Sequence, residues 1–203
     1  MAGRTFAFDL DMTLIDSRPG IIASFAALSA ETGVPVDGEL VCTRLGPKLE
    51  DELANWFPLE RIPEAAASYR RHYERECVTG TTALPGAVTL AAEMRARGDR
   101  VVVVTAKAGS AAHVCLRTVG IEYDDVAGWC FGTEKTEAIV ARGASVYVGD
   151  TVTDIAAGRA AGVLTLGVTT GPDDRAALAR AGADIVVDEL SEARDALAAL
   201  GQW

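Results

Sequence analysis

From Pro85 onward, the sequence alternates between short apolar runs and longer helical patterns. The run at 100–105 is continuous and β-branched, which is typical of a strand buried on both faces of a parallel sheet. The other strand-like segments are 126–131, 145–149, 163–168 and 184–187, and the helical patterns are 85–98, 110–119, 134–142, 153–161, 173–181 and 191 onward. Alternating strands and helices form βαβ units. We therefore predict an α/β fold with a Rossmann-like, doubly wound parallel sheet, which the N-terminal run 6–9 would join.

The segment from 16 to 82 has a different pattern. It contains no strand of the buried type, and helical patterns begin at Ser17, which is placed as an N-cap, and at Asp37, Leu49 and Glu60. The first of these helices should end at Gly33. We expect a small all-helical cap domain at 16–82, inserted into a catalytic core formed by 1–15 and 83–203. The two short junctions between them suit a hinge.

Two aspartates, Asp9 and Asp11, follow the first predicted strand. Residues i and i+2 of a strand point to the same side, so carboxylates at this spacing bring like charges together. Such crowding is costly unless a cation or a shared proton compensates it. The pair therefore indicates a nucleophile beside an acid/base, with a divalent metal between them.

Three further polar groups fall where later strands of the predicted sheet should end. They are Thr105-Ala106-Lys107, then Lys135 in the helix after 126–131, and finally Asp150 with Asp154. Open α/β sheets bind ligands at the carboxyl ends of their strands. With the first two aspartates, these residues supply a nucleophile, an acid/base, a hydroxyl, an ammonium and further carboxylates. That set fits phosphoryl transfer through a covalent aspartyl intermediate.

These residues occur in the order of four sequence motifs: Asp9-Leu-Asp11-Met-Thr13, Thr105, Lys135, and Asp150 with Asp154. Over nearly its whole length the chain resembles the haloacid dehalogenase superfamily, and in particular its phosphatases with a helical cap after the first strand. The resemblance implies that Asp9 attacks phosphorus, and that Asp11 protonates the leaving oxygen and later deprotonates the attacking water. It further implies phosphoryl binding by Thr105, the Ala106 amide and Lys135, and a structural role for Thr13 in holding Asp11.

The same resemblance implies a Mg²⁺ cofactor. Asp9, Asp150 and the backbone carbonyl of Asp11 would ligate the ion, and Asp154 would bind it directly or through water, since Mg²⁺ commonly keeps several waters. Many of these phosphatases have glycine where this chain has Met12, which puts the local loop geometry in question. The dehalogenases of the family generally lack the acid/base aspartate, because a halide leaves without a proton, so Asp11 favours an oxygen leaving group.

In the predicted cap, Arg44-Leu-Gly46-Pro-Lys48 resembles a substrate-facing loop of phosphoglycolate phosphatase-like members. Gly46 would let the loop approach the core, and Lys48 would meet a carboxylate or a second phosphate; the alternative for both is a plain helix-cap turn. Lys107 is the alternative to Lys135 as the phosphate-binding lysine. We interpret the basic cluster at 70–75 as a solvated helix face.

The acidic composition limits the classes of partner. The net charge of −10 argues against nucleic acid and anionic membranes, because both favour a basic surface. The sequence shows no pattern of a secretory signal, no uncharged run of transmembrane length and four scattered cysteines. We therefore expect a cytoplasmic protein with reduced thiols, whose oligomeric state the sequence does not specify.

Taken together, the motifs predict a Mg²⁺-dependent phosphatase that hydrolyses a small phosphomonoester through an aspartyl-phosphate. Phosphoglycolate is the leading substrate. Three alternatives remain at this point: an inorganic pyrophosphatase of the same superfamily, a sugar-phosphate mutase, and a non-catalytic binding protein built on the same fold.

Overall fold

The computed structural model describes residues 3–203, apart from the side chain of Cys77, so our interpretation of that thiol lies outside the described residues. The strands are β1 (Thr5–Phe8), β2 (Ile15–Asp16), β3 (Thr82–Ala83), β4 (Arg100–Val104), β5 (Asp125–Ala127), β6 (Val146–Gly149), β7 (Leu164–Val168) and β8 (Ile185–Val187). The helices up to β3 are α1 (Arg18–Thr32), α2 (Gly38–Cys42), α3 (Leu49–Leu53), the short 3₁₀ helix η1 (Leu59–Arg61) and α4 (Ile62–Gly80). The later helices are α5 (Ala87–Ala96), α6 (Gly109–Val119), α7 (Thr133–Ala141), α8 (Val152–Ala160), α9 (Arg175–Ala181), η2 (Leu190–Glu192) and α10 (Ala193–Ala199).

Six strands form one parallel sheet in the order β5-β4-β1-β6-β7-β8. After β1 the chain builds β4 and β5 on one side of that strand, and then returns to build β6, β7 and β8 on the other side. The strand order thus reverses at β1, and ligands bind beyond the carboxyl ends of the strands at such a switch point. The predicted doubly wound parallel sheet is confirmed.

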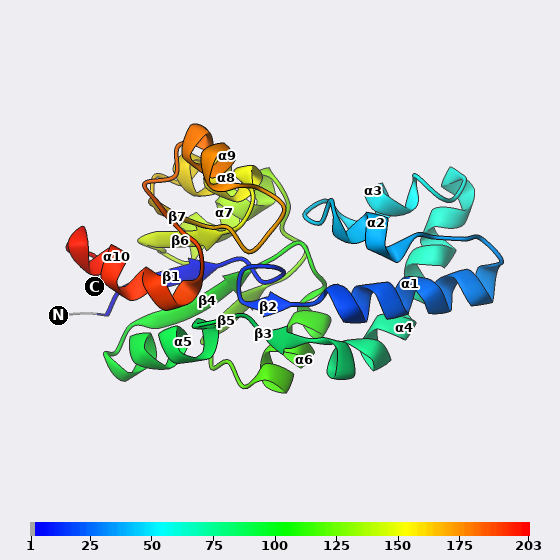
Figure 1. Ribbon diagram of the computed structural model, residues 1–203, viewed down its shortest axis with the longest axis horizontal. Coiled ribbons are helices and arrows are strands. Elements are labelled where there is room, and N and C mark those ends of the chain that lie inside the picture. The colour runs from blue at the N-terminus through cyan, green and yellow to red at the C-terminus, as the bar shows by residue number, and fades with distance from the viewer. Residues whose placement is uncertain (1–2) are drawn as a thin grey trace.

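Alternating side chains of the strands feed two separate apolar clusters, one on each face of the sheet. Phe6, Phe8, Val101 and Val103 belong to one cluster, together with residues of α5, α6 and α10. Ala7 and the intervening valines of β4 belong to the other, together with residues of α7 and α8. Figure 1 shows the same division, with α5 and α6 below the sheet and α7, α8 and α9 above it. Burial on both faces explains why these strands are continuously apolar.

The helices α1 to α4 form a separate all-helical body beside the carboxyl edge of the sheet (Figure 1). A two-stranded antiparallel pair, β2 with β3, connects this body to the core. Its interior centres on α1 and α4, where the rings of Phe25 and Tyr69 lie 4.5 Å apart, and it merges with the apolar cluster under one face of the sheet. The domain limits at 15/16 and 82/83 remain a prediction.

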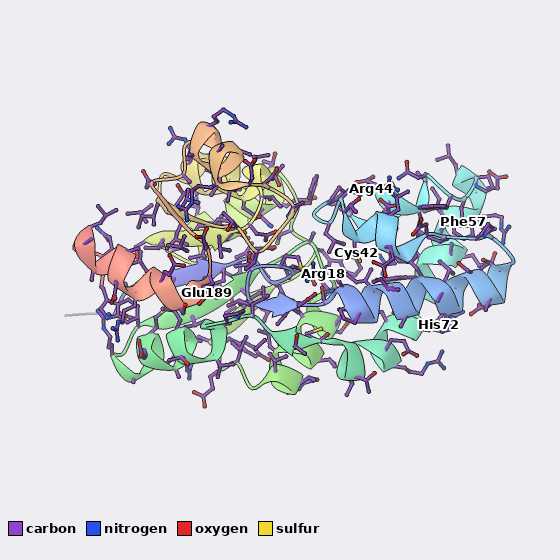
Figure 2. The ribbon with its side chains drawn as sticks, viewed as in Figure 1. Arg18, Cys42, Arg44, Phe57, His72 and Glu189 are labelled. Carbon is purple, nitrogen blue, oxygen red and sulfur yellow. The ribbon has the colours of Figure 1, made fainter. Side chains whose placement is uncertain are left out.

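Where α1 starts and α4 ends, the two helices meet backbone to backbone. A Cβ atom added to Gly80 would lie 2.4 Å from the backbone nitrogen of Gly20, so only glycine allows this contact. Next to it, Arg18 forms a bidentate ion pair with Asp16 at the point where β2 passes into α1 (Figure 2).

Two local expectations differ from the structure. The strand expected at 126–131 is only β5, because the chain turns at Gly128, where a Cβ atom would lie 2.3 Å from the Gly109 nitrogen, and continues with Trp129 at a left-handed φ of 62°. Ser17 does occupy the N-cap position of α1, and the helix ends at Gly33 as expected, but the Ser17 hydroxyl makes no capping bond. It donates instead to a carboxylate of the site described below.

Within the described part of the chain, no helix combines the length and apolar character needed to cross a membrane. Cys42, Cys115 and Cys130 are free thiols.

Candidate active site

A cavity of about 230 Å³ lies at the carboxyl edge of the sheet, between the core and the helical body. The core side is lined by Asp9, Asp11, Thr105, Ala106, Lys107, Lys135, Asp150 and Asp154. The helical side is mainly apolar and is lined by residues that include Ile21, Phe25, Leu45, Leu49 and Tyr69. The structure thus brings together every core residue that the sequence motifs single out, except Thr13, which lies just behind the cavity.

Asp9 follows β1 directly and stays in line with the sheet, since its backbone N–H donates to the Val148 carbonyl at 2.8 Å. The Lys135 ammonium, in the first turn of α7, lies 2.9 Å from Asp9 Oδ1 and 2.7 Å from Asp154 Oδ1. All three side chains are buried. Lys135, rather than Lys107, is therefore the lysine in contact with Asp9.

Burial controls the ionisation of this group. It raises the pKa of Asp9 to about 7, with the carboxylates of Asp154 and Asp11 adding to the shift and Lys135 opposing it. Burial, followed by the charges of Asp154 and Asp9, raises the pKa of Asp150 well above its usual range. Burial alone would lower the pKa of Lys135, but the carboxylates of Asp154 and Asp9 outweigh it and hold that pKa well above its usual range.

Asp154 is held by four donors. It stands at the third position of α8 and completes a capping box with Thr151, whose backbone N–H and hydroxyl both donate to Oδ2. Lys135 and the Tyr147 hydroxyl donate to Oδ1, the latter at 3.0 Å. A carboxylate accepts about four hydrogen bonds, so these contacts fill the capacity of Asp154. Burial favours its protonated form, but Lys135 and these hydrogen bonds lower the pKa of Asp154 below the usual value.

Asp11 faces the cavity from the loop after β1 and has two partners of different origin. The Ser17 hydroxyl donates to its Oδ1, and the ammonium of Lys107 lies 3.1 Å from the same oxygen. Burial favours the neutral amine of Lys107, but the Asp11 carboxylate outweighs burial and raises the Lys107 pKa. The serine one residue after Asp16 and the lysine two residues after Thr105 therefore hold the second aspartate.

Thr13 supports a different aspartate from the one we expected. Its hydroxyl donates to Asp150 Oδ1 at 2.6 Å, because the loop turns sharply and directs this side chain behind the cavity, toward the end of β6. The turn depends on Met12, which adopts a left-handed φ of 60° with its side chain buried. That conformation favours glycine, so Met12 adopts it at an energetic cost. The Thr170 hydroxyl donates to the Met12 carbonyl at 2.5 Å and so stabilises this backbone conformation.

Thr105 and Ala106 lie where β4 ends, just before α6. The Thr105 side chain is buried, and its Oγ accepts a hydrogen bond from the Lys107 N–H at 3.1 Å. Ala106 lines the cavity beside it. Both residues thus stand within the loop that leads to the N-terminus of a helix, where backbone N–H groups favour anions.

Gly46 and Lys48, which we expected to face the substrate, occupy different places in the structure. Gly46 lines the cavity at a φ of 131°, with a virtual Cβ 3.9 Å from Thr151 of the core. Lys48 is not among the described lining residues, and its ammonium forms a half-exposed ion pair with Glu134 of α7 at 3.0 Å. A contact between Lys48 and substrate remains a prediction.

Some cavity residues were missed by sequence reasoning. Arg70, which we interpreted as part of a solvated helix face, lines the cavity, pairs with Glu50 and lies 4.6 Å above the ring of Trp129. Arg44, labelled in Figure 2, belongs to the loop that we expected to face the substrate; it lines the cavity and is held by a bidentate pair with Glu52. Gly171, after β7, packs so closely on Asp150 that a Cβ atom would lie 1.9 Å from Oδ2. Gly171 follows the parallel strand β7, and residues that follow such strands meet at the carboxyl edge of the sheet, so the sequence did offer a signal for this residue.

The carboxylates form a donor set that fits a hard divalent cation. Oxygens of Asp9, Asp150 and Asp154 all lie within 4.8 Å of one another, and all three residues are buried. When all three carboxylates are ionised, they exceed the single ammonium of Lys135 by two negative charges. Oxygen ligands and a charge of this size suit Mg²⁺ or a similar ion.

Comparisons with known proteins agree with this geometry. A family model described as haloacid dehalogenase-like hydrolase matches residues 6–159, and a HAD-hydrolase-like model matches 132–193. The phosphoglycolate phosphatase of Rhodospirillum rubrum is 29% identical over 221 aligned residues, which cover 97% of this chain and 88% of that protein. Among solved structures, a haloacid dehalogenase-like family hydrolase from Streptococcus pneumoniae matches with a TM-score of 0.82 and 25% identity, covering 96% of this chain and 98% of that one.

One relative that matches a shorter part of this chain is named as a kinase and not as a phosphatase. The tyrosine-protein kinase PtkA of Mycobacterium tuberculosis is 36% identical over 124 residues, or 60% of this chain, and the chain spans only 43% of the kinase. The family model, in contrast, extends from β1 through α8 and includes all four motifs. Our prediction of the superfamily is confirmed: this chain belongs to the haloacid dehalogenase-like hydrolase family.

Proposed function

We propose that this protein is a Mg²⁺-dependent phosphatase that hydrolyses a small phosphomonoester through an aspartyl-phosphate on Asp9. The observation that carries the proposal is the contact of Lys135 with both Asp9 and Asp154, beside Asp150, at the carboxyl edge of the sheet. Family membership and the relative named phosphoglycolate phosphatase, which matches along nearly the whole chain, support it.

In the first half-reaction, an Asp9 oxygen attacks phosphorus while the bond from phosphorus to the ester oxygen breaks. The departing oxygen takes a proton from the Asp11 carboxyl and leaves as the hydroxyl group of the alcohol product. Lys135 neutralises charge on the transferring group, and Thr105 with the Ala106 N–H binds its oxygens. Both aspartates line the cavity, and Asp11 is held by Lys107 whereas Asp9 is held by Lys135, which supports this division of roles.

In the second half-reaction, a water oxygen attacks the phosphorus of the aspartyl-phosphate and loses a proton to Asp11. The bond from phosphorus to Asp9 breaks, which releases inorganic phosphate and restores the carboxylate. The apolar cap side of the cavity limits the entry of other water during both steps.

Asp9, Asp150 and the Asp11 carbonyl would hold the Mg²⁺ ion, which supplies charge stabilisation to the phosphoryl oxygens when bound. Asp154 would bind the ion directly or through water, in exchange for one of the four donors that its oxygens accept from in this structure.

Phosphoglycolate is our leading substrate, and a small phosphorylated metabolite in the cytoplasm is the expected setting. A phosphate-release screen over many phosphomonoesters with Mg²⁺ tests the proposal. The panel includes phosphoglycolate and three compounds that test the alternatives. Hexose phosphates test a sugar-phosphate mutase, inorganic pyrophosphate tests a pyrophosphatase, and ATP tests the activity named for the kinase relative. Release from at least one small monoester, above the release from pyrophosphate and ATP, is the expected result. A panel without any release would refute it.

Magnesium is expected to stabilise EDTA-treated protein more at pH 8 than at pH 5. The Asp9 pKa rises from 3.8 in an unfolded chain to about 7 in the fold. A raised carboxyl pKa contributes stability that is present at low pH and is lost as the pH rises through about 7. Bound Mg²⁺ compensates the negative charge that Asp9 gains when it loses its proton above that pH. We expect Tm to rise by about 5–10 °C at pH 8, with magnesium 100-fold above its Kd, and by less at pH 5.

Thermal unfolding with and without Mg²⁺ measures this effect. Asp150→Asn should lose most of the response, whereas Asp188→Asn, which removes an exposed carboxylate after β8, should keep it. An equal response at both pH values, or a full response in Asp150→Asn, would contradict the assignment of the ion to this cluster.

A further inference from the structure

Lysine is rare in this chain and is confined to one region. The sequence has three lysines and sixteen arginines, and Lys48, Lys107 and Lys135 each pair with a carboxylate at the cavity or its rim. A lysine is a compact point charge, whereas arginine is a broad planar fork, so the two are not interchangeable in a confined site. Two of the three lysines have a place in the site already described, as the partner of Asp9 and as an ion pair at the rim. For Lys107, the only role described so far is its contact with Asp11.

Lys107 is fixed in the wall of the cavity on the Asp11 side. Its backbone N–H donates to Thr105 Oγ at 3.1 Å, and its carbonyl accepts from the Trp129 N–H at 2.9 Å. The side chain is only 11% exposed, yet it lines the cavity. A backbone held at both ends and a buried stem leave the ammonium little freedom to move.

The cap helps to hold the same ammonium. The Tyr73 hydroxyl on α4 lies 2.8 Å from Lys107 Nζ, and the ammonium stands 4.1 Å from the centre of the Tyr73 ring. The Tyr73 ring stacks on Tyr69, with centroids 5.8 Å apart, so it is itself supported by the buried interior of the cap. An ammonium carries three N–H donors, and the described residues supply Asp11 and Tyr73 as its two oxygen partners. One donor therefore remains for a ligand in the cavity.

The place of this donor relates it to the leaving group. In the proposed reaction the ester oxygen must come within hydrogen-bond reach of Asp11. Lys107 Nζ lies 3.1 Å from Asp11 Oδ1, so atoms attached to that ester oxygen enter the reach of the ammonium. A carboxylate joined to the oxygen through one carbon lies about one hydrogen-bond length from it, and it would meet Lys107. The other cavity cations near the cap, Arg44 and Arg70, are paired with Glu52 and Glu50.

We propose that Lys107, supported by Tyr73, is the specificity-determining residue for an anionic group on the leaving group of the substrate. The class favoured is a phosphomonoester with a carboxylate one carbon away from the ester oxygen. This inference rests on the proposed function, and it assigns to Lys107 the contact that the sequence pattern suggested for Lys48.

The test compares two esters that differ only in charge, 2-phosphoglycolate and its neutral carboxamide. For each enzyme the ratio of the two kcat/KM values is measured, which cancels differences in the amount of folded protein. Hydrogen bonds to a charged group discriminate by about 10- to 100-fold, so wild-type protein should prefer the carboxylate by that factor. Lys107→Met should bring the ratio to within about threefold of one. Arg71→Met, which changes an exposed side chain on α4, should keep the wild-type ratio.

Each other outcome would overturn the inference. Equal slowing of both esters in Lys107→Met would mean that Lys107 only orients Asp11. A wild-type ratio near one would remove the anionic subsite, and a ratio lost in Lys48→Met but kept in Lys107→Met would move it to the rim.

A binding comparison separates this inference from the proposed function. Calorimetry of the two esters with Asp9→Asn protein, with and without Lys107→Met, needs no turnover. A preference for the carboxylate ester that disappears with Lys107 would support the subsite even if the wild type releases no phosphate. Equal affinities in both backgrounds would overturn it.

Discussion

Asp9→Asn is expected to lower turnover by roughly 10⁴-fold or more while the protein remains folded. The amide has the shape of the carboxylate but cannot form an acyl-phosphate, so the first half-reaction has no acceptor. Removing one of three clustered carboxylates also relieves like-charge repulsion, and Lys135 keeps Asp154 as its partner. The Tm in EDTA at pH 8 should therefore be unchanged or higher than that of the wild type. Phosphate release and thermal unfolding are measured on the same preparation.

A second readout makes this expectation specific to the nucleophile. Wild-type protein quenched with acid during turnover should carry phosphate on a carboxyl group that hydroxylamine removes, and the variant should carry none. Asp188→Asn provides a matched control, since it makes the same substitution at an exposed position. Turnover above about one-tenth of the wild-type rate in Asp9→Asn would exclude Asp9 as the attacking group.

Lys135→Met is expected to cause the largest loss of stability of any single lysine change. It removes the ammonium that contacts Asp9 and Asp154, and it leaves buried carboxylates without a compensating charge. Breaking a buried pair in this way costs about 3–5 kcal/mol, which corresponds to a fall in Tm of about 6–20 °C for a chain of this size. Turnover should also fall by about 10²-fold or more, since a charge that stabilises the transferring group is lost.

Lys48→Met is the matched control for stability, because it removes the same group from a half-exposed ion pair with Glu134. Surface pairs contribute about 1 kcal/mol or less, so its Tm should change by no more than a few degrees. Part of the stability of Lys135→Met should return when Mg²⁺ is added, since the ion compensates the same carboxylates. Equal effects of the two variants on Tm would contradict the electrostatic account of the buried cluster.

The parts of the fold and site that follow strand order could be predicted from the sequence. The β-branched run before Thr105 and the apolar run before Asp9 read as buried strands, because both faces of the sheet are covered. Parallel strands share one carboxyl edge, so the residues that follow them meet there whatever the details of the loops. This is why Asp9, Lys135 and Asp150 lie together in the structure as the motifs implied.

The parts that depend on loop turns and on the cap could not be predicted in this way. A left-handed Met12 directs Thr13 toward Asp150, and no periodic pattern encodes such a turn. Arg70 belongs to a basic cluster at 70–75 that is typical of a solvated surface, yet the core lies opposite and the Trp129 ring lies against its guanidinium. Contacts between cap and core depend on how two bodies face each other, which local periodicity does not describe.

The backbone contact between Gly20 and Gly80 has a consequence for how such a protein diversifies. It brings the first turn of α1 against the last turn of α4, at the two points where the chain enters and leaves the helical body. A methyl group at Gly80 would overlap the Gly20 backbone, so the start of α1 and the end of α4 would have to move apart, and both helices carry residues that line the cavity. A substitution at Gly80 would therefore change the shape of the cavity from a position that does not line it.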